Sequence, residues 1–179
     1  SLNNAFSPAR ANNGDRKGLN WGTGDSSWAD ANPGSYPDWL QITFNATQTI
    51  AEIDVFTAQN DYQAPVEPTP TQTFTLYGIT AFQVQYWNGS GWLDVPGGNV
   101  TGNNLVWRKF TFAPIATDRI RVLVNAAPNY SLITELEAWA VAGGDTTAPS
   151  VPVGLSASAT NSTGTTLTWS ASTDNVGVA

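Results

Sequence analysis

The chain has 179 residues, of which 41% are hydrophobic, and its formal net charge is −7. This length allows one domain with a sizeable core and one shorter segment. His, Cys and Met are absent, which excludes Ser-His-Asp and Cys-His catalysis, disulfides, and zinc sites built on His or Cys. The seven Lys and Arg residues form no cluster in the sequence, so we expect no nucleic-acid partner. No apolar run approaches the roughly 18 residues that span a bilayer, so we expect no membrane insertion.

Apolar and polar residues alternate along several segments, which is the pattern of β-strands. The alternation falls at residues 38–45, 51–57, 82–87, 109–112 and 119–124. The sequence Trp87-Asn88-Gly89-Ser90-Gly91-Trp92 predicts a hairpin, because Asn-Gly favours a tight turn between two strands. Many short strands with turn-rich connections predict an all-β sandwich or jelly roll.

Three long loops are expected to carry ligand binding, because binding residues often lie on loops held by a rigid scaffold. These loops are residues 22–37, 59–73 and 125–132. Sugars are recognised by aromatic faces with hydrogen-bonding side chains beside them. The residues of this kind in the three loops are Trp28, Tyr36, Gln59, Asn60, Asp61, Tyr62, Asn129 and Tyr130. The alternative is that several of these aromatic rings pack against their own loops. Trp39, Trp107 and Trp139 lie in predicted strands, where we expect packing.

A short turn and a distant strand are expected to form one cation site. The turn lies in residues 11–21, and the strand, residues 133–139, contains Glu135 and Glu137. A buried carboxylate is costly unless a cation or donor meets it, and Asn, Asp and loop carbonyl oxygens suit calcium. The alternative is an ordinary turn, with the glutamates solvated or paired with arginine.

The chain changes character at residues 143–148, where Gly, Thr and Pro replace the alternating pattern. We therefore predict a domain over residues 1–142, a linker over 143–148 and a second segment over 149–179. The second segment contains about two strands, too few to bury a core alone. We expect it to dock onto a neighbour or to be completed by other segments, with strands crossing between chains in a self-assembly.

Residues 1–142 resemble the discoidin, or coagulation factor 5/8 type C, family, which overlaps bacterial family 32 carbohydrate-binding modules. The resemblance depends on Asn13-Gly14-Asp15 followed by Trp21, and on residues 36–42, 82–87, 119–122 and 133–137. It implies a galactose-binding-like jelly roll with a structural calcium ion between the early turn and the last strand. The implied ligands are Asn13, Asp15, backbone carbonyls near Ala11 and Gly18, and Glu135, with Glu137 in reserve. Two departures are a missing opening strand and Asn13 where the family usually has Asp, which weakens a calcium site.

Residues from about 149 onward resemble the start of a fibronectin type III domain. Residues 149–155 fit its first strand, and Leu167-Thr168-Trp169 fits its second. The resemblance implies a partial immunoglobulin-like segment, which in bacteria typically spaces modules of secreted polysaccharide-degrading enzymes.

Together these patterns predict a non-catalytic carbohydrate-binding module of a secreted or surface protein of bacteria, with a glycan or polysaccharide as its partner. The alternative is an adhesive or structural module that binds a protein or another copy of itself. A concave site with aromatic and amide groups favours the first, and a flat apolar patch favours the second. Glu135 and Glu137 lie two apart on one strand, so they project to the same face and do not flank a substrate as glycosidase carboxylates do.

Overall fold

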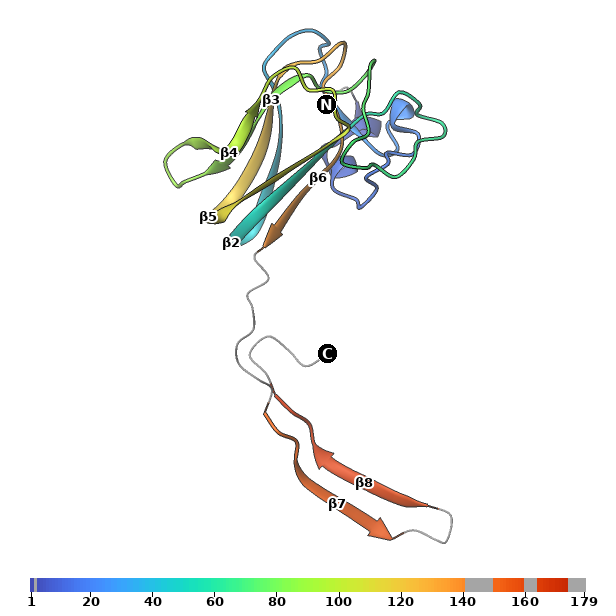
Figure 1. Cartoon of the computed structure of the whole chain (residues 1–179), viewed down its shortest axis with the longest axis vertical. Helices are drawn as coiled ribbons and strands as arrows, with labels where there is room; N and C mark the ends of the chain where they lie inside the picture. The colour runs from blue at the N-terminus through green and yellow to red at the C-terminus, as the bar shows by residue number, and fades with distance from the viewer. Residues whose placement is uncertain (2, 141–149, 160–163, 174–179) are drawn as a thin grey trace. The chain divides into compact units, whose positions relative to one another are not determined.

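The computed structural model describes residues 1, 3–140, 150–159 and 164–173. It divides the chain into two units, Ser1–Val141 and Ala142–Ala179, each of which is considered by itself. The first unit consists of short 3-10 helices followed by strands (Figure 1). In chain order they are η1 (Asn4–Phe6), η2 (Pro8–Ala11), η3 (Trp21–Thr23), β1 (Trp28–Ala29), β2 (Asp38–Thr57), β3 (Ala81–Trp87), β4 (Trp92–Val100), β5 (Trp107–Ala126) and β6 (Leu132–Ala140). No helix in these described residues is long and apolar enough to cross a membrane.

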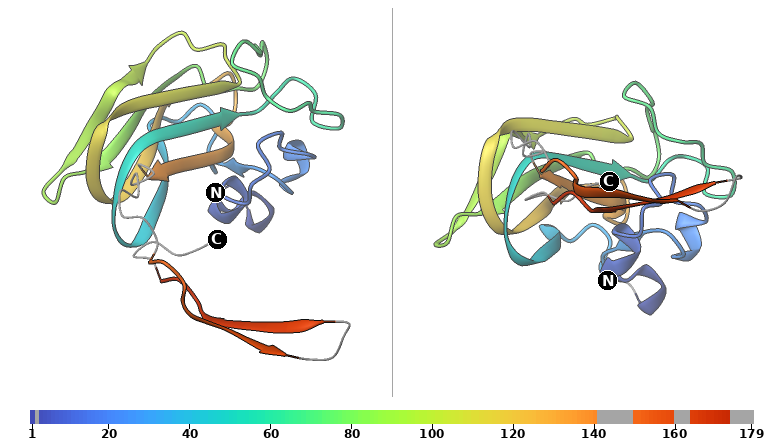
Figure 2. Two further views of the ribbon diagram at one scale, coloured as in Figure 1. Left: turned by 60° about the horizontal axis from the view of Figure 1, so that its bottom comes forward. Right: turned by 90° about the horizontal axis from the view of Figure 1, so that it is seen from below.

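Two strands of 20 residues each, β2 and β5, contribute to both layers of the first unit. They pair antiparallel, and their register shifts between Thr43 and Gln48 and between Ile50 and Glu52. The second half of β2 also pairs with β6, whereas the second half of β5 pairs with β3, giving the order β1-β6-β2-β5-β3-β4. The long strands curve across the molecule (Figure 2). The predicted all-β sandwich of the jelly-roll type is confirmed.

The core lies between the two layers and consists of alternate residues of each strand. Its members include Ile53 and Val55 of β2, Phe82 and Val84 of β3, and Ile120, Val122 and Val124 of β5. These are the apolar positions that the period-two pattern assigned to one face. Ile42 and Phe44, at the bend of β2, are only partly buried against this core.

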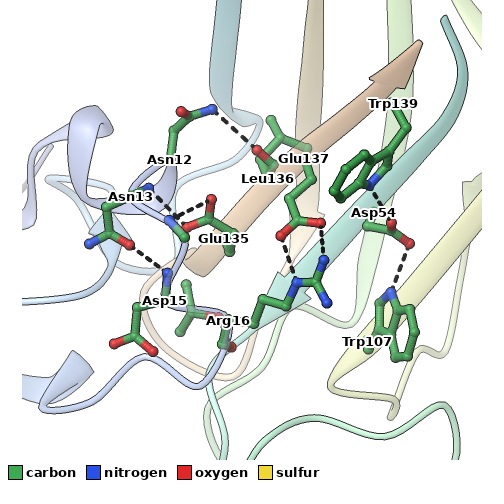
Figure 3. A network of polar contacts seen from close by, with 12 residues as sticks. Asn12, Asn13, Asp15, Arg16, Asp54, Trp107, Glu135, Leu136, Glu137 and Trp139 are labelled. Atoms are coloured by element: carbon green, nitrogen blue, oxygen red, sulfur yellow. Dashed lines mark hydrogen bonds and ion pairs between the residues drawn. The ribbon is translucent and has the colours of Figure 1, made fainter. Parts of the chain in front are cut away.

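An irregularity in β6 separates the two predicted glutamates from the core. Ile133 pairs with Thr57 and Glu135 pairs with Phe56, so Thr134 is an extra residue on β6. As a result Ile133 and Leu136 are both fully buried although they are three residues apart. Glu135 and Glu137 lie on the opposite face of the strand, toward the turn that follows η2 (Figure 3).

The predicted hairpin between Trp87 and Trp92 is confirmed. These two residues are register partners at the ends of β3 and β4. The backbone N–H of Asn88 donates to the carbonyl of Gly91 at 3.1 Å. The side-chain oxygen of Asn88 accepts from the backbone N–H of Ser90 and from that of Gly91, each at 2.9 Å. Gly89 has a φ of 96°, which explains glycine at this place in the turn.

The second unit contains an antiparallel pair, β7 (Val153–Ala159) and β8 (Thr165–Ser170). Its described apolar side chains Val151, Val153, Leu155, Leu167 and Trp169 are exposed, which agrees with too few strands to bury a core. The fibronectin type III resemblance, and the docking or completion of this segment in an assembly, stay predictions. The predicted linker at 143–148 lies outside the described residues.

Leu136→Ala should lower the free energy of unfolding of the first unit by about 2–5 kcal/mol, because it opens a cavity in a well-packed core. Leu136 is completely buried, whereas Leu93 is 45% exposed and serves as the matched control. Leu93→Ala should change stability by about 0.5 kcal/mol or less. Urea unfolding followed by tryptophan fluorescence measures both values. Equal effects of the two substitutions would contradict the core described here.

Candidate functional site

The turn between η2 and η3 is held by its own side chains and lies close to β6. The carboxylate of Asp15 accepts the backbone N–H of Gly18 at 3.2 Å and that of Leu19 at 2.9 Å. Asn13 in turn accepts the backbone N–H of Asp15 at 2.9 Å through its side-chain oxygen. A side chain at Gly18 would collide with Thr134 of β6, so glycine permits the close approach of turn and strand.

Glu135 joins this turn to β6 by a buried carboxylate that receives two backbone donors. Glu135 is only 3% exposed. The N–H of Asn13 donates to Oε2 at 3.1 Å and the N–H of Gly14 donates to Oε1 at 3.2 Å (Figure 3). Burial raises the pKa of Glu135, and the two N–H donors partly oppose that shift. The residue therefore joins the turn to the strand through two backbone hydrogen bonds.

Glu137 is engaged by an arginine of the same turn. Arg16 makes a bidentate pair with it, Nε to Oε1 at 2.6 Å and Nη2 to Oε2 at 2.8 Å (Figure 3). The hydrogen bond with Glu137 raises the pKa of Arg16. The guanidinium carbon also lies 5.4 Å from the centre of the Phe56 ring. This is the arginine pairing that the sequence left open as an alternative to metal binding.

The residues predicted as calcium ligands lie near one another, but internal donors meet their carboxylates. Ala11 is buried in the core, and Asn13, Asp15 and Gly18 hold the turn by the hydrogen bonds described above. Within the described residues, no three His, Cys, Asp or Glu side chains gather as a metal-binding group. The carboxylates of Asp15 and Glu135 accept separate backbone donors. Calcium binding stays a prediction.

Another buried carboxylate, that of Asp54 of β2, lies on the outer side of the same layer. It is 2% exposed and accepts the indole N–H of Trp107 at 2.8 Å and that of Trp139 at 3.0 Å (Figure 3). Burial raises the pKa of Asp54. The Trp107 ring stacks on Phe56 with 5.4 Å between ring centres. Trp107 thus packs as expected for a strand tryptophan. Trp139 is 47% exposed and is held by its indole hydrogen bond, which corrects its expected packing.

Three of the predicted ligand-binding residues use their polar groups to shape the loop at 59–73. Gln59 is buried and donates to the carbonyl of Val66 at 2.6 Å. Asn60 accepts the backbone N–H of Thr75 at 3.0 Å, and Asp61 accepts that of Gln63 at 2.9 Å. These contacts explain the abundance of amides and acids in this loop.

The predicted aromatic residues are divided between the interior and the surface. Trp28 is only 4% exposed, which corrects its expected position at an exposed loop tip, because burial leaves no open ring face. Tyr36 donates its hydroxyl hydrogen to the carbonyl of Ala127 at 2.7 Å. Tyr130 packs in a small cluster with Phe6 and Trp21. Tyr62 is 38% exposed and lies edge-on against Trp21, with 5.8 Å between ring centres.

Asn129, the remaining predicted ligand residue, is exposed, and its carbonyl lies 3.2 Å from the Tyr36 hydroxyl. Most of the predicted ligand residues therefore hold the loops in place by hydrogen bonds or packing. Only some of them face solvent.

A cleft of about 370 Å³ lies where the 22–37 loop meets the start of β2. Its lining includes Trp28, Asp30, Asn32, Asp38, Trp39 and Gln41. Trp39 is 55% exposed, because its neighbour Leu40 points into the core and alternation turns the indole outward. Sequence reasoning expected Trp39 to be packed. The exposure of Trp39 can be read from the phase of the alternation, because Leu40 and Ile42 occupy the inner face and Trp39 therefore lies on the outer face.

The polar side of this cleft is fixed by hydrogen bonds to Ser131. Asp30 accepts the backbone N–H of Ser131 at 2.6 Å and that of Asn32 at 2.7 Å. Asp38 accepts the hydroxyl of Ser131 at 2.7 Å. Burial raises the pKa of Asp38 and the Ser131 hydrogen bond opposes this, while the charge of Asp30 raises it further. The cleft therefore combines one exposed indole with held hydrogen-bonding groups, the combination that sugar sites use.

Residues 3–136 match the F5/8 type C domain family, and the chain belongs to that family. It is a non-catalytic binding module. No curated protein sequence is similar enough to match the chain.

Solved structures of the same fold include carbohydrate-binding modules. Chitosan-binding module 1 of a chitosanase/glucanase from Paenibacillus sp. IK-5 has 18% identity and a TM-score of 0.56, with 76% of this chain and 87% of that chain covered. Module 2 of that enzyme, in complex with chitotriose, has 19% identity and a TM-score of 0.55 over 76% and 88% of the two chains. The lectin domain of lectinolysin, complexed with Lewis B antigen, has 12% identity and a TM-score of 0.54 over 78% and 87%. At these identities the likeness shows the fold alone.

The predicted calcium site has a direct test in thermal unfolding. If the ion binds at the Asn13–Glu135 junction, millimolar calcium should raise the melting temperature by mass action and EDTA should reverse the increase. Glu135→Gln should remove the calcium response and lower stability by about 1–3 kcal/mol, because one buried backbone donor loses its acceptor. An identical melting curve in calcium and in EDTA would contradict the prediction. The two backbone N–H donors would then be the groups that offset the cost of burying the Glu135 carboxylate.

Stability should rise as the pH falls toward about 4, the ordinary pKa range of a carboxyl group. Burial raises the pKa of Glu135 and of Asp54 in the folded protein, so the folded state takes up these protons before the unfolded state does. This contribution is fully present below the unfolded-state pKa and is lost as the pH rises through the folded-state pKa. Melting temperature against pH measures the effect. Glu135→Gln, which cannot titrate, should show a smaller increase than the unaltered protein, and an equal increase would remove Glu135 as a source.

Proposed function

We propose that this domain is a carbohydrate-binding module and that it binds a glycan in the cleft beside Trp39. The observation that carries the proposal is the concavity of about 370 Å³ with a half-exposed indole at its side. An indole face stacks on the C–H face of a sugar ring, and nearby carboxylates and amides hydrogen-bond its hydroxyls. The parent protein is proposed to be bacterial and extracellular, where the glycans that such modules bind are found.

The proposed site differs from the loop set predicted from the sequence. The side chains of Gln59, Asn60 and Asp61 hydrogen-bond backbone groups. Fewer of their polar atoms are therefore free to bind sugar hydroxyls. In the cleft, Gln41 is partly exposed and Asp38 has one oxygen held by Ser131. A site whose polar groups are fixed before binding loses little conformational entropy when the ligand arrives.

The comparisons support the proposal by their chemistry. The solved modules of the same fold are named for chitosan and chitotriose, and the lectin domain is complexed with Lewis B antigen. These ligands share pyranose rings with one apolar face and a rim of polar groups. An adhesive role for the domain would need a protein partner in place of these sugars and is the alternative if no glycan binds.

Trp39→Ala should weaken glycan binding about tenfold or more, because it removes the stacking surface without touching the core. The probes are chitotriose, soluble chitosan and the Lewis B oligosaccharide, each measured by isothermal titration calorimetry. Tyr62→Ala is the matched control, since Tyr62 is also a half-exposed aromatic but lies in the 59–73 loop. Unchanged melting temperatures of both variants establish that folding is intact.

Loss of binding in Tyr62→Ala with full binding in Trp39→Ala would place the site at the loops and overturn the cleft. If the unaltered protein binds none of the probes, the proposal that it binds these classes of glycan is overturned.

A further inference from the structure

A row of polar side chains crosses the outer face of four adjacent strands, starting at the cleft. Gln41 of β2 is the register partner of Arg121 of β5. Arg121 is in turn the partner of Gln85 of β3. Gln85 is the partner of Asp94 of β4. Leu40, Val122 and Val84 belong to the core. Alternation therefore places the members of the row on the side of the layer that faces away from the core.

Arg121, Gln85 and Asp94 are joined by side-chain hydrogen bonds from strand to strand. The amide of Gln41 donates to the hydroxyl of Thr43 on its own strand at 2.8 Å. Arg121 donates through Nε to Oε1 of Gln85 at 2.7 Å. Gln85 donates to Oδ1 of Asp94 at 2.7 Å, and Gln83 donates to Oδ2 of the same carboxylate at 3.0 Å. These contacts fix the orientation of the Gln83 and Gln85 amides and of the Arg121 guanidinium. The remaining N–H groups and lone pairs keep constant directions relative to the sheet.

Tryptophan rings lie at both ends of this row. At the β4 end, the Arg121 guanidinium carbon is 4.3 Å from the ring centre of Trp92. Trp92 meets Trp87 edge to face, with 5.6 Å between ring centres. At the β2 end, Gln41 lines the cleft that contains exposed Trp39. Burial lowers the pKa of Arg121, and the charge of Asp94 opposes this shift.

We propose that the row from Gln41 to Asp94 extends the cleft into a binding surface for several consecutive sugar units, so that the ligand is an internal stretch of a polysaccharide. The proposal rests on the proposed function, because the cleft supplies the first sugar position. Neighbouring strands lie about 4.8 Å apart, so the three intervals between the four strands span about 14 Å. A single sugar covers only one end of such a surface, whereas an oligosaccharide reaches the tryptophan pair at the other.

The chemistry of the row suits a glycan. Hydroxyls both donate and accept hydrogen bonds, and the row offers amide, guanidinium and carboxylate groups in alternation. Because the groups hold one another in place, binding immobilises few additional side chains. A ligand with several weak contacts then gains affinity with each unit that it adds.

The test is the dependence of affinity on oligosaccharide length. The probes are series of two, four and six units of glucosamine, N-acetylglucosamine and galacturonic acid, measured by calorimetry on the full chain. In the series that binds, the six-unit member should bind about tenfold tighter than the two-unit member. Arg121→Gln should bring the affinity for the six-unit member close to that for the two-unit member.

The control is Lys109→Gln. Lys109 is on the same strand, but it pairs with Glu52 at 2.8 Å and lies over Trp107, outside the row and the tryptophan pair at its end. It should keep the full length dependence. Asp94→Ala provides a second variant in the row, outside the cleft, in case Arg121→Gln unfolds, and melting temperatures check both.

The outcomes separate the two proposals. Equal affinity for two and six units, with no effect of Arg121→Gln or Asp94→Ala, overturns the extended surface and leaves the cleft in place. Absence of binding to any oligomer by the unaltered protein overturns both. A length dependence lost equally in Lys109→Gln also overturns the row, because it would locate the effect elsewhere on the domain.

Discussion

The antiparallel pairing of β2 with β5 is the constraint on which the rest of the first unit depends. Each strand is long enough to pass from one layer to the other, and the register shifts inside β2 are where it bends. Everything else attaches to one half of this pair: β6 to the second half of β2, and β3 with β4 to the second half of β5. The same pairing sets which residues face outward, and so it positions Trp39, Gln41 and Arg121 on neighbouring strands.

A second physical theme is the treatment of buried carboxylates. Glu135 receives two backbone N–H groups, Asp30 receives two more, and Asp54 receives two indole N–H groups. In each case donors from separate parts of the chain meet one acid, so the hydrogen bonds also fix tertiary structure. The cost of desolvation remains visible in the raised pKa of Glu135 and Asp54. Each of these three carboxylates is therefore met by N–H donors of the chain itself.

The sequence predicted the strands well, because their signal is local. Alternation along 82–87 and 119–124 gave the correct inner faces, and the Asn-Gly turn gave the hairpin at 87–92. The extra residue at Thr134 was not predictable, because a bulge shows itself only through the pairing of β6 with β2. Membership of a loop was also a poor guide to exposure. Trp28, placed in a long loop, is buried, whereas Trp39, placed in a strand, is half exposed.

The opposite exposures of Trp28 and Trp39 are relevant to where binding sites form on β-sandwiches. A loop aromatic must be supported, and support in a short chain comes from packing, which hides the ring. A strand residue on the outer face is supported by the backbone ladder beneath it, so its side chain is free to remain in solvent. Polar neighbours on adjacent strands then hold one another, as Arg121, Gln85 and Asp94 do. A rigid face of this kind costs little entropy on binding, which favours the sheet surface next to the cleft over the loop tips as the place where a glycan is held.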